Sequence, residues 1–450
     1  MQQQPDRQQP TQTSHGATRR DFIKTSAVVA GAAAASSVLP LGGVYAAGSD
    51  VIKVGLIGCG GRGGGAALNA LNADESNKIH ALGDLFPDRL ETKLQQLTKE
   101  AEKRIDVPKE RRFTGIDAYK GVIEACDVVL LATPPHFRPT HLAAALAANK
   151  HVFCEKPVGV DVPSVKKVME LCEQAKAKKL NVVSGLCYRY DEAKREIMEK
   201  IHSGAVGDII SLQGMYNTGG LWVAPRQSQW SDMEWQLRNW LYFTWLSGDH
   251  IVEQHIHTLD KMMWMMKDQP PMKVTGNGGR TQRTGPEYGN IYDHFDTIYE
   301  WNIDGRPVRA YNQTRQWVNV DTDVSDWAFG TKGIADIMGL KITGENKWKR
   351  KESKENMYDS EHKALFAAIR SGEPINNGDY MCKSTLVAIM GRMSAYTGKT
   401  IYWDKAAAKA DKKASAPTLM ENTEDLSPPK YEFGPLPVPP VAVPGKGKIA

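Results

Sequence analysis

The sequence predicts an α/β protein with two domains, the first built on a doubly wound parallel sheet and the second an α/β domain with a mostly antiparallel open sheet. Two patterns carry this prediction. Short apolar runs alternate with amphipathic stretches between residues 51 and 186, and longer runs with alternating polarity follow. The 450 residues, of which 41% are hydrophobic and 24% charged, suffice for two or three domains.

Five short apolar runs in the first half are predicted to be parallel strands, because helical stretches separate them at the spacing of β-α-β units. They are residues 51–57, 79–84, 128–132, 151–154 and 181–185. The run 128–132 is apolar throughout, which is typical of a strand covered on both faces.

The second half is predicted to alternate longer strands with helices, and short turns between several strands favour antiparallel pairing. The predicted strands are residues 209–216, 295–303, 307–314 and 325–330. The predicted helices are residues 192–202, 252–266, 359–371 and 379–396. We therefore place domain boundaries at 50–186, 187–405 and an extended, Pro-rich tail at 406–450.

Residues 1–47 read as a twin-arginine export signal. Arg19 and Arg20 precede an Ala-rich apolar run at 27–41 and a small-residue cleavage site near Ala46. This order predicts export to the periplasm, and the short apolar run is a poor permanent membrane anchor. The formal net charge of +5 is too mild and too evenly spread to indicate nucleic-acid binding.

A glycine-rich turn follows the first predicted strand directly and opens a helix, which is the setting of a Rossmann dinucleotide site. The residues expected to contact the cofactor there are Gly58, Gly60, Gly61, Arg62 and Gly63. Asp84, 21 residues after Gly63 at the end of the second strand, is expected to accept from the adenosine ribose hydroxyls. A carboxylate repels a 2′-phosphate, so NAD is favoured over NADP.

Two further strand ends are expected to border the cofactor, because such sheets bind ligands beyond the carboxyl ends of their strands. Thr133, Pro134 and His136 follow the strand 128–132, and Glu155 and Lys156 follow the strand 151–154. Lys156 is expected to polarise a hydroxyl or carbonyl oxygen beside the nicotinamide; a surface lysine is the alternative.

The densest polar cluster contains His250, Glu253, His255 and His257, and helical spacing places the first, second and fourth on one face of the predicted helix. His257 is a candidate base for a hydroxyl proton, with Glu253 orienting its ring. A metal site and histidines satisfied within a core are the alternatives. Hydride transfer to NAD needs no metal, so we predict none.

The chain resembles the Gfo/Idh/MocA oxidoreductases over roughly residues 50 to 405. The resemblance rests on the glycine turn, Thr133-Pro134-Pro135, the Glu155-Lys156-Pro157 element, His257-Thr258-Leu259-Asp260 and the stretch 361–372. It implies that Lys156 and His257 are the catalytic lysine and histidine. Glu253 stands where many members have Asp, and His255 where Gly is frequent, so the substrate end is altered.

The resemblance further implies a carbohydrate substrate and a homo-oligomer, a dimer or tetramer formed through the second domain's sheet. Tyr188 and Arg189 match a family segment that reaches the active site, so we expect them to contact substrate with His255 and Trp240. Trp240 belongs to a Trp-rich stretch whose flat side chains suit sugar rings, although packing is their commoner use.

Three functions fit these observations. The first is NAD(P)-dependent oxidation or reduction of a sugar, glycoside or polyol hydroxyl, with tightly bound NAD because an exported enzyme meets no maintained NAD pool. The second is a redox-neutral NAD-dependent glycosidase that oxidises, eliminates and reduces. The third is a non-catalytic carbohydrate-binding protein, against which the retention of Lys156 and His257 argues.

Overall fold

The computed structural model describes residues 51–446, and the predicted export signal lies outside them. The first domain is built on six parallel strands in the order β3-β2-β1-β4-β5-β6. Their bounds are β1 Lys53–Ile57, β2 Lys78–Asp84, β3 Arg112–Thr114, β4 Val128–Leu131, β5 His151–Cys154 and β6 Val182–Ser184. The strand order reverses beside β1, which is the topological switch point where such sheets bind ligands.

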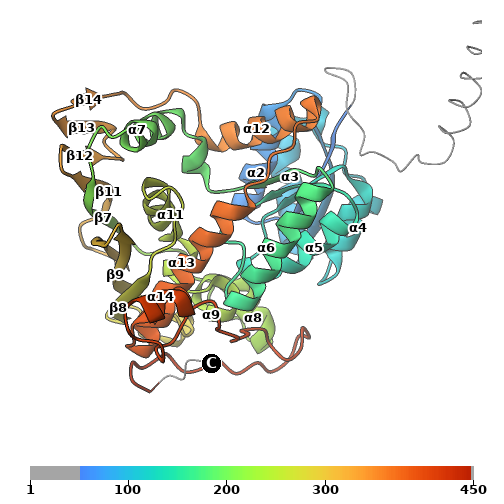
Figure 1. Cartoon of the computed structure of the whole chain (residues 1–450). Coiled ribbons are helices and arrows are strands. Elements are labelled where there is room, and N and C mark those ends of the chain that lie inside the picture. Colours follow the sequence, from blue (N-terminus) through green and yellow to red (C-terminus); the bar gives the residue numbers. More distant parts are fainter. Residues whose placement is uncertain (1–50, 447–450) are drawn as a thin grey trace, which may run out of the picture. The chain divides into compact units, whose positions relative to one another are not determined.

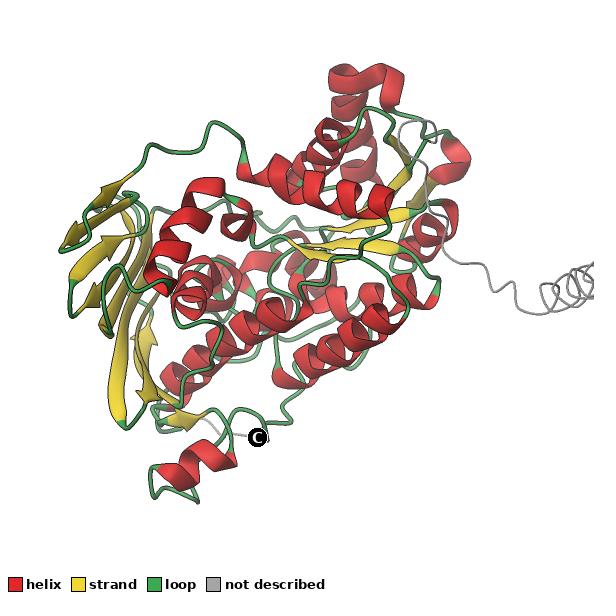
Figure 2. Ribbon diagram, turned by 45° about the horizontal axis from the view of Figure 1, so that its top comes forward, coloured by secondary structure: helices red, strands yellow, loops and turns green. Residues whose placement is uncertain are grey.

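Helices cover both faces of this sheet (Figure 2). They are α2 Gly61–Ala73, α3 Pro87–Ala101, α4 Ala118–Ala125, α5 Arg138–Ala147 and α6 Val162–Ala177. Because both faces are covered, all four residues of β4 are fully buried, as the unbroken apolar run predicts. α6 begins with a capping box in which Asp161 accepts from the backbone N–H of Ser164.

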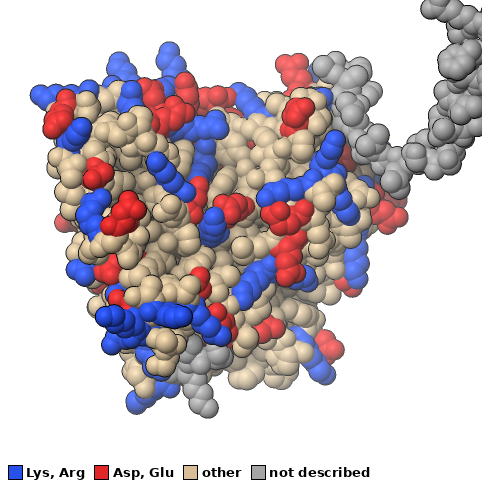
Figure 3. All heavy atoms as spheres, in the orientation of Figure 1, with Lys and Arg blue, Asp and Glu red and all other residues tan. Residues whose placement is uncertain are grey.

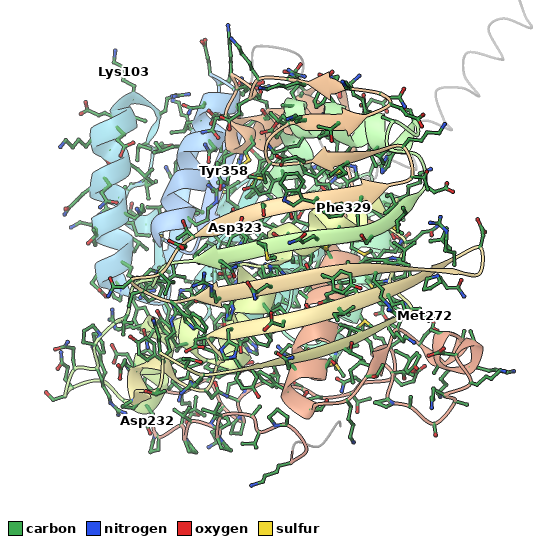
Figure 4. The ribbon with its side chains drawn as sticks, turned by 90° about the vertical axis from the view of Figure 1, so that its left-hand side faces the viewer. Lys103, Asp232, Met272, Asp323, Phe329 and Tyr358 are labelled. Carbon is green, nitrogen blue, oxygen red and sulfur yellow. The ribbon has the colours of Figure 1, made fainter. Side chains whose placement is uncertain are left out.

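The second sheet has nine strands in the order β14-β13-β12-β11-β7-β10-β9-β8-β15, and Figure 4 looks onto its open face. The strands are β7 Ile209–Thr218, β8 Lys273–Gly279, β9 His294–Ile303, β10 Arg306–Gln316, β11 Asp323–Gly330, β12 Gly333–Asp336, β13 Lys341–Gly344, β14 Trp348–Lys349 and β15 Ile401–Tyr402. Only β7 and β10 pair in parallel among these strands. Both sheets confirm the predicted fold class.

The helices of the second half lie on one side of the nine-stranded sheet or return to the first domain (Figure 1). They are α7 Glu192–His202, α8 Asp232–Arg238, α9 Thr244–Ser247, α10 His250–Glu253, α11 Ile256–Met265, α12 Met357–Ser371, α13 Gly378–Thr397 and α14 Lys405–Ala410. α12 packs against α2, and α13 packs against both α6 and β8. α12 and α13 therefore join the two domains.

The prediction of one helix over residues 252–266 is wrong. α10 ends at Glu253 and α11 begins at Ile256. The N–H of His255 bonds to the carbonyl oxygen of His250, five residues earlier, so the helical register shifts at this point. His250, Glu253 and His257 consequently do not share one face of a continuous helix.

The chain after α14 runs extended over the surface to residue 446, hydrogen-bonded to the rest of the protein at several points. Within the described residues, none of the helices combines the length and apolar character that crossing a membrane requires. On the face drawn in Figure 3, basic and acidic side chains are interspersed.

Candidate functional site: a dinucleotide crevice with a Lys-Glu-His cluster

The glycine turn between β1 and α2 has two glycines that packing requires, Gly58 and Gly63, and two that face open space, Gly60 and Gly61. A Cβ on Gly58, whose φ is +101°, would lie 2.7 Å from the backbone of Ala132 and Thr133, and one on Gly63 would clash with the carbonyl oxygen of Gly58. A Cβ on Gly60 would meet nothing within 4 Å. The free N–H groups at the start of α2 therefore open onto unfilled space, which is the setting that a pyrophosphate needs.

A crevice opens from this turn along the carboxyl ends of β1, β2, β3 and β4. Its lining includes Gly58, Gly60, Asp84, Arg89, Tyr119, Thr133, Pro134, His141, Leu237 and Trp240. The carboxylate of Asp84 accepts from the N–H of Cys59 (2.7 Å) and of Phe86 (2.9 Å). These bonds fix the carboxylate at the edge of the crevice, where an adenosine ribose is expected.

His136 does not line this crevice, contrary to prediction. Its Nε2 is 2.7 Å from the hydroxyl of Tyr431, and its ring packs edge-on against Trp245. Burial lowers the pKa of His136 to about 4, so the ring is neutral. The side chain points away from the end of β4 because the C-terminal tail supplies its partner.

Arg62 lies between two carboxylates instead of reaching freely toward a cofactor. Its guanidinium forms ion pairs with Glu155 and with Glu361 of α12, the latter at 3.4 Å. Burial and the charge of Glu155 raise the pKa of Glu361 well above its usual value. Burial alone would raise the pKa of Glu155 as well, but Arg62 outweighs it and the pKa is lowered. Arg62 therefore favours the ionised form of Glu155, whereas burial beside Glu155 favours the protonated form of Glu361.

Lys156, at the carboxyl end of β5, is held by the second domain. Its Nζ donates to the carbonyl oxygen of Glu253 (2.7 Å) and to Glu253 Oε1 (3.0 Å). The two side chains are 15% and 12% exposed, so the ion pair is largely shielded but open on one side. Glu253 thus orients Lys156, whereas the sequence predicts that it orients His257.

His257 lies in the first turn of α11, beside the ion pair of Lys156 and Glu253. Burial lowers the pKa of His257 well below its usual value, and the charges of Lys156 and Lys261 lower it further. Its Nδ1 is buried with no hydrogen-bond partner among the described residues. The ring of Tyr188 packs edge-on against it, 5.5 Å between centroids. The arrangement therefore keeps the imidazole in its neutral form.

The other two histidines of the cluster lie in the interior of the second domain. His250 and His255 are both fully buried. His250 packs against Phe295 and lies 3.1 Å from the carboxylate of Asp249, and burial lowers the pKa of His255 to about 3. His255 is therefore not placed to contact a substrate from solvent. The described residues contain no group of three His, Cys, Asp or Glu side chains arranged to hold a metal ion.

Arg189 has a structural position, contrary to the prediction that it contacts substrate. Its guanidinium binds Asp260 (2.8 Å) and Asp268 (2.6 Å) and lies 4.2 Å from the centre of the Tyr380 ring. Its side chain is 8% exposed and fully engaged by these groups. Trp240 lines the crevice beside Asp84 and Arg89.

Several lining residues have no clear signal in the sequence. Tyr119 and His141 stack at 4.5 Å between ring centroids in the wall of the crevice. Tyr119 follows β3, a three-residue strand with one apolar side chain, which leaves no periodic pattern to detect. Leu237 arrives from α8, more than 150 residues from Asp84, so only the tertiary structure reveals it.

Residues 52–184 match the model of an oxidoreductase family with an NAD-binding Rossmann fold, the Gfo/Idh/MocA family. The match spans the first domain. The glycine turn, Asp84 and the Glu155-Lys156-Pro157 element described above all lie at the edge of the matched domain that binds ligands.

Two curated proteins are similar to this chain over part of their length. One is 2,7-anhydro-N-acetylneuraminate hydratase from Escherichia coli, 26% identical over 227 residues, or 49% of this chain and 55% of that protein. The other is inositol 2-dehydrogenase from Corynebacterium glutamicum, 25% identical over 210 residues, or 46% of this chain and 58% of that protein. The chain thus spans little more than half the length of these relatives.

The fold also matches solved structures across both domains. The crystal structure of myo-inositol 2-dehydrogenase from Lactobacillus plantarum superimposes with a TM-score of 0.60, covering 78% of this chain and 99% of that one at 20% identity. This similarity shows that the two chains share one overall fold, which includes both the Rossmann domain and the second sheet domain.

Replacing Arg189 with Met should destabilise the protein without affecting cofactor binding. The change leaves the buried Asp260 carboxylate without its charged partner, although the hydrogen bond from Ser384 remains, so we expect the free energy of unfolding at pH 7 to fall by about 3–5 kcal/mol. Urea denaturation measures this effect, and Arg350→Met, at an exposed ion pair with Glu192 and Glu196, is the control that should change little. A stable Arg189→Met variant with a raised KM for its sugar would instead restore Arg189 as a substrate contact.

Proposed function

We propose that this protein is an NAD-dependent oxidoreductase that acts on a hydroxyl group of a sugar, glycoside or polyol. The observation that carries the proposal is the position of Lys156, held by Glu253 at the ligand-binding edge of a sheet whose glycine turn leaves room for a dinucleotide. The relatives named for inositol and sialic-acid derivatives support a polyhydroxylated substrate.

The residues present fit NAD. Gly60 leaves space for the pyrophosphate beside the start of α2, and Asp84 offers a fixed carboxylate to the adenosine ribose. That carboxylate also disfavours the 2′-phosphate of NADP, although Arg89 lies in the same wall. NAD, when bound, supplies the hydride acceptor.

The chain's own residues supply the proton chemistry. The Lys156 ammonium is positioned to donate a hydrogen bond to the reacting oxygen and so stabilise negative charge there. His257, kept neutral by its surroundings, takes the hydroxyl proton. Glu253 fixes the direction of Lys156 through two bonds, and its carboxylate balances the ammonium charge.

A redox-neutral reaction is the second candidate. One relative is named a hydratase instead of a dehydrogenase, and the Glu253 carboxylate lies beside Lys156, where it adds a second proton-transfer group. We propose export by the twin-arginine route on the basis of residues 1–47, and export favours a cofactor that is reused at each turnover.

We also propose that the protein assembles as a homo-oligomer through the open face of the nine-stranded sheet (Figure 4). This face exposes large apolar side chains, with Tyr311 46% and Ile298 38% accessible to solvent. Exposed apolar residues gathered on a regular sheet are typical of an interface.

Replacing Gly60 with Ala should weaken NAD binding without weakening the fold. The backbone at Gly60 (φ −74°, ψ −170°) suits any residue, so stability should hold or rise by about 0.4–1 kcal/mol. The added methyl group projects where the pyrophosphate is expected, and we expect NAD affinity to fall about tenfold or more. Isothermal titration calorimetry measures the affinity for NAD. Gly219→Ala is the control, because a methyl group there also meets nothing within 4 Å. Unchanged affinity would place the dinucleotide elsewhere.

Lys156→Ala and His257→Ala should each lower kcat by about 10²–10⁴-fold. The first removes the ammonium that stabilises negative charge in the transition state, and the second removes the group that takes the proton. NAD should remain bound in both variants, since the glycine turn and Asp84 are intact. Turnover of inositols and aldoses, followed by absorbance at the NADH wavelength, is the measurement. Full activity in either variant would remove that residue from the mechanism.

The two candidate reactions differ in what they need besides substrate. Purified protein incubated in deuterated water with candidate glycosides and no added NAD should turn over and take deuterium into the ring only if elimination occurs. Turnover that requires a second carbonyl acceptor, without ring deuteration, indicates oxidoreduction. An absence of both across a broad set of sugars would favour a binding protein and contradict the proposal.

A further inference from the structure

The outer wall of the dinucleotide crevice comes from the second domain. Leu237 of α8 and Trp240 of the following 3₁₀ turn line the crevice with Asp84 and Arg89. We call residues 230–242 the cover segment. Since Asp84 marks the adenosine end of a Rossmann site, the cover segment lies over that end.

One arginine fastens the cover segment to the first domain. Arg238 binds both carboxylate oxygens of Asp88 in α3, at 3.0 and 3.1 Å, and stacks 3.8 Å from the centre of the Phe86 ring. Arg89 donates to the carbonyl oxygen of Arg238 (2.9 Å). Phe86, Asp88 and Arg89, which follow β2, therefore hold the cover segment against the first domain.

The C-terminal tail holds the cover segment from outside. We call residues 425–436 the strap; Figure 1 shows the red C-terminal segment passing below α8 and α9. The N–H of Met233 donates to the carbonyl oxygen of Gly434 (3.2 Å), and Gln236 donates to that of Leu436 (2.7 Å). The N–H of Leu436 donates back to Asp232 (3.1 Å). The strap thus pairs with the whole length of α8.

The same strap is anchored on the first domain at three points. Phe433 stacks on Phe86 with 6.1 Å between ring centroids and 6° between planes. Tyr431 bonds to His136 at 2.7 Å, and the N–H of Leu426 donates to Asp161 at the start of α6 (3.1 Å). Prolines at 428, 429 and 435 restrict the backbone, which lowers the entropy lost when the strap docks.

From these contacts we infer that Leu237 and Trp240 bind the adenosine end of the cofactor, and that the strap positions them and slows cofactor release. This inference rests on the proposed function. A dinucleotide enclosed by the cover segment leaves only when that segment moves, and movement of α8 requires its bonds to the strap to break. The strap therefore acts on the dissociation rate more than on the association rate, which suits an enzyme that keeps its NAD between turnovers.

The test compares NAD release from full-length protein and strap variants. The variants are Tyr431→Phe combined with Phe433→Ala, which removes two anchors, and a deletion of residues 426–450. Val438→Ala, at an exposed position just beyond the strap, is the matched control. Each protein is loaded with NADH, mixed with excess NAD, and followed by stopped-flow fluorescence; bound NAD after desalting and thermal unfolding without cofactor are measured in parallel.

We expect about tenfold faster NADH dissociation in the double variant and a larger effect in the deletion, with unfolding temperatures of the cofactor-free double variant and control alike. Equal dissociation rates in the wild type, double variant and deletion would overturn the role of the strap while leaving the proposed function intact. Wild-type protein that binds neither NAD nor NADH would overturn the proposed function itself.

Discussion

The ion pair between Lys156 and Glu253 is the interaction on which the candidate site depends. Lys156 lies two residues beyond a strand of the first domain, β5, and Glu253 ends a short helix of the second, so neither domain holds the ammonium in place alone. The pair is shielded from bulk water, which strengthens both its mutual attraction and its effect on a bound oxygen. Burial lowers the pKa of His257, and the charge of the same ammonium lowers it further.

The crevice and the Lys156 cluster are held by different contacts. Around Lys156, which is not among the residues that line the crevice, the contacts are ionic, and His257 Nδ1 has no partner among the described residues. Beside Asp84 and Arg89, the lining consists of Leu237 and Trp240, with an aromatic cluster behind them. A mostly apolar lining with a few polar groups is typical of a ligand site.

The sequence predicts the first domain well because its signals are local. Strands such as Val128–Leu131 are apolar runs of the right length, and the role of Gly58 follows from a turn within six residues. The predictions that differ from the structure concern residues whose contact partners lie far away in the sequence. His136 is turned by Tyr431, almost 300 residues later, and Arg189 by Asp260 and Asp268. The break between α10 and α11 arises from a shift in backbone bonding that side-chain periodicity does not encode.

The separation of the cover segment from the Lys156 cluster has a mechanical consequence under the proposed function. Release of a dinucleotide would require the bonds from Arg238 to Asp88, and from α8 to the tail, to break, yet none of these contacts involves Lys156, Glu253 or His257. The proposed catalytic groups are instead held by α10, α11 and the residues after β5. Substrate exchange beside Lys156 would therefore proceed without opening the cover segment, and one cofactor would stay bound through many substrate turnovers.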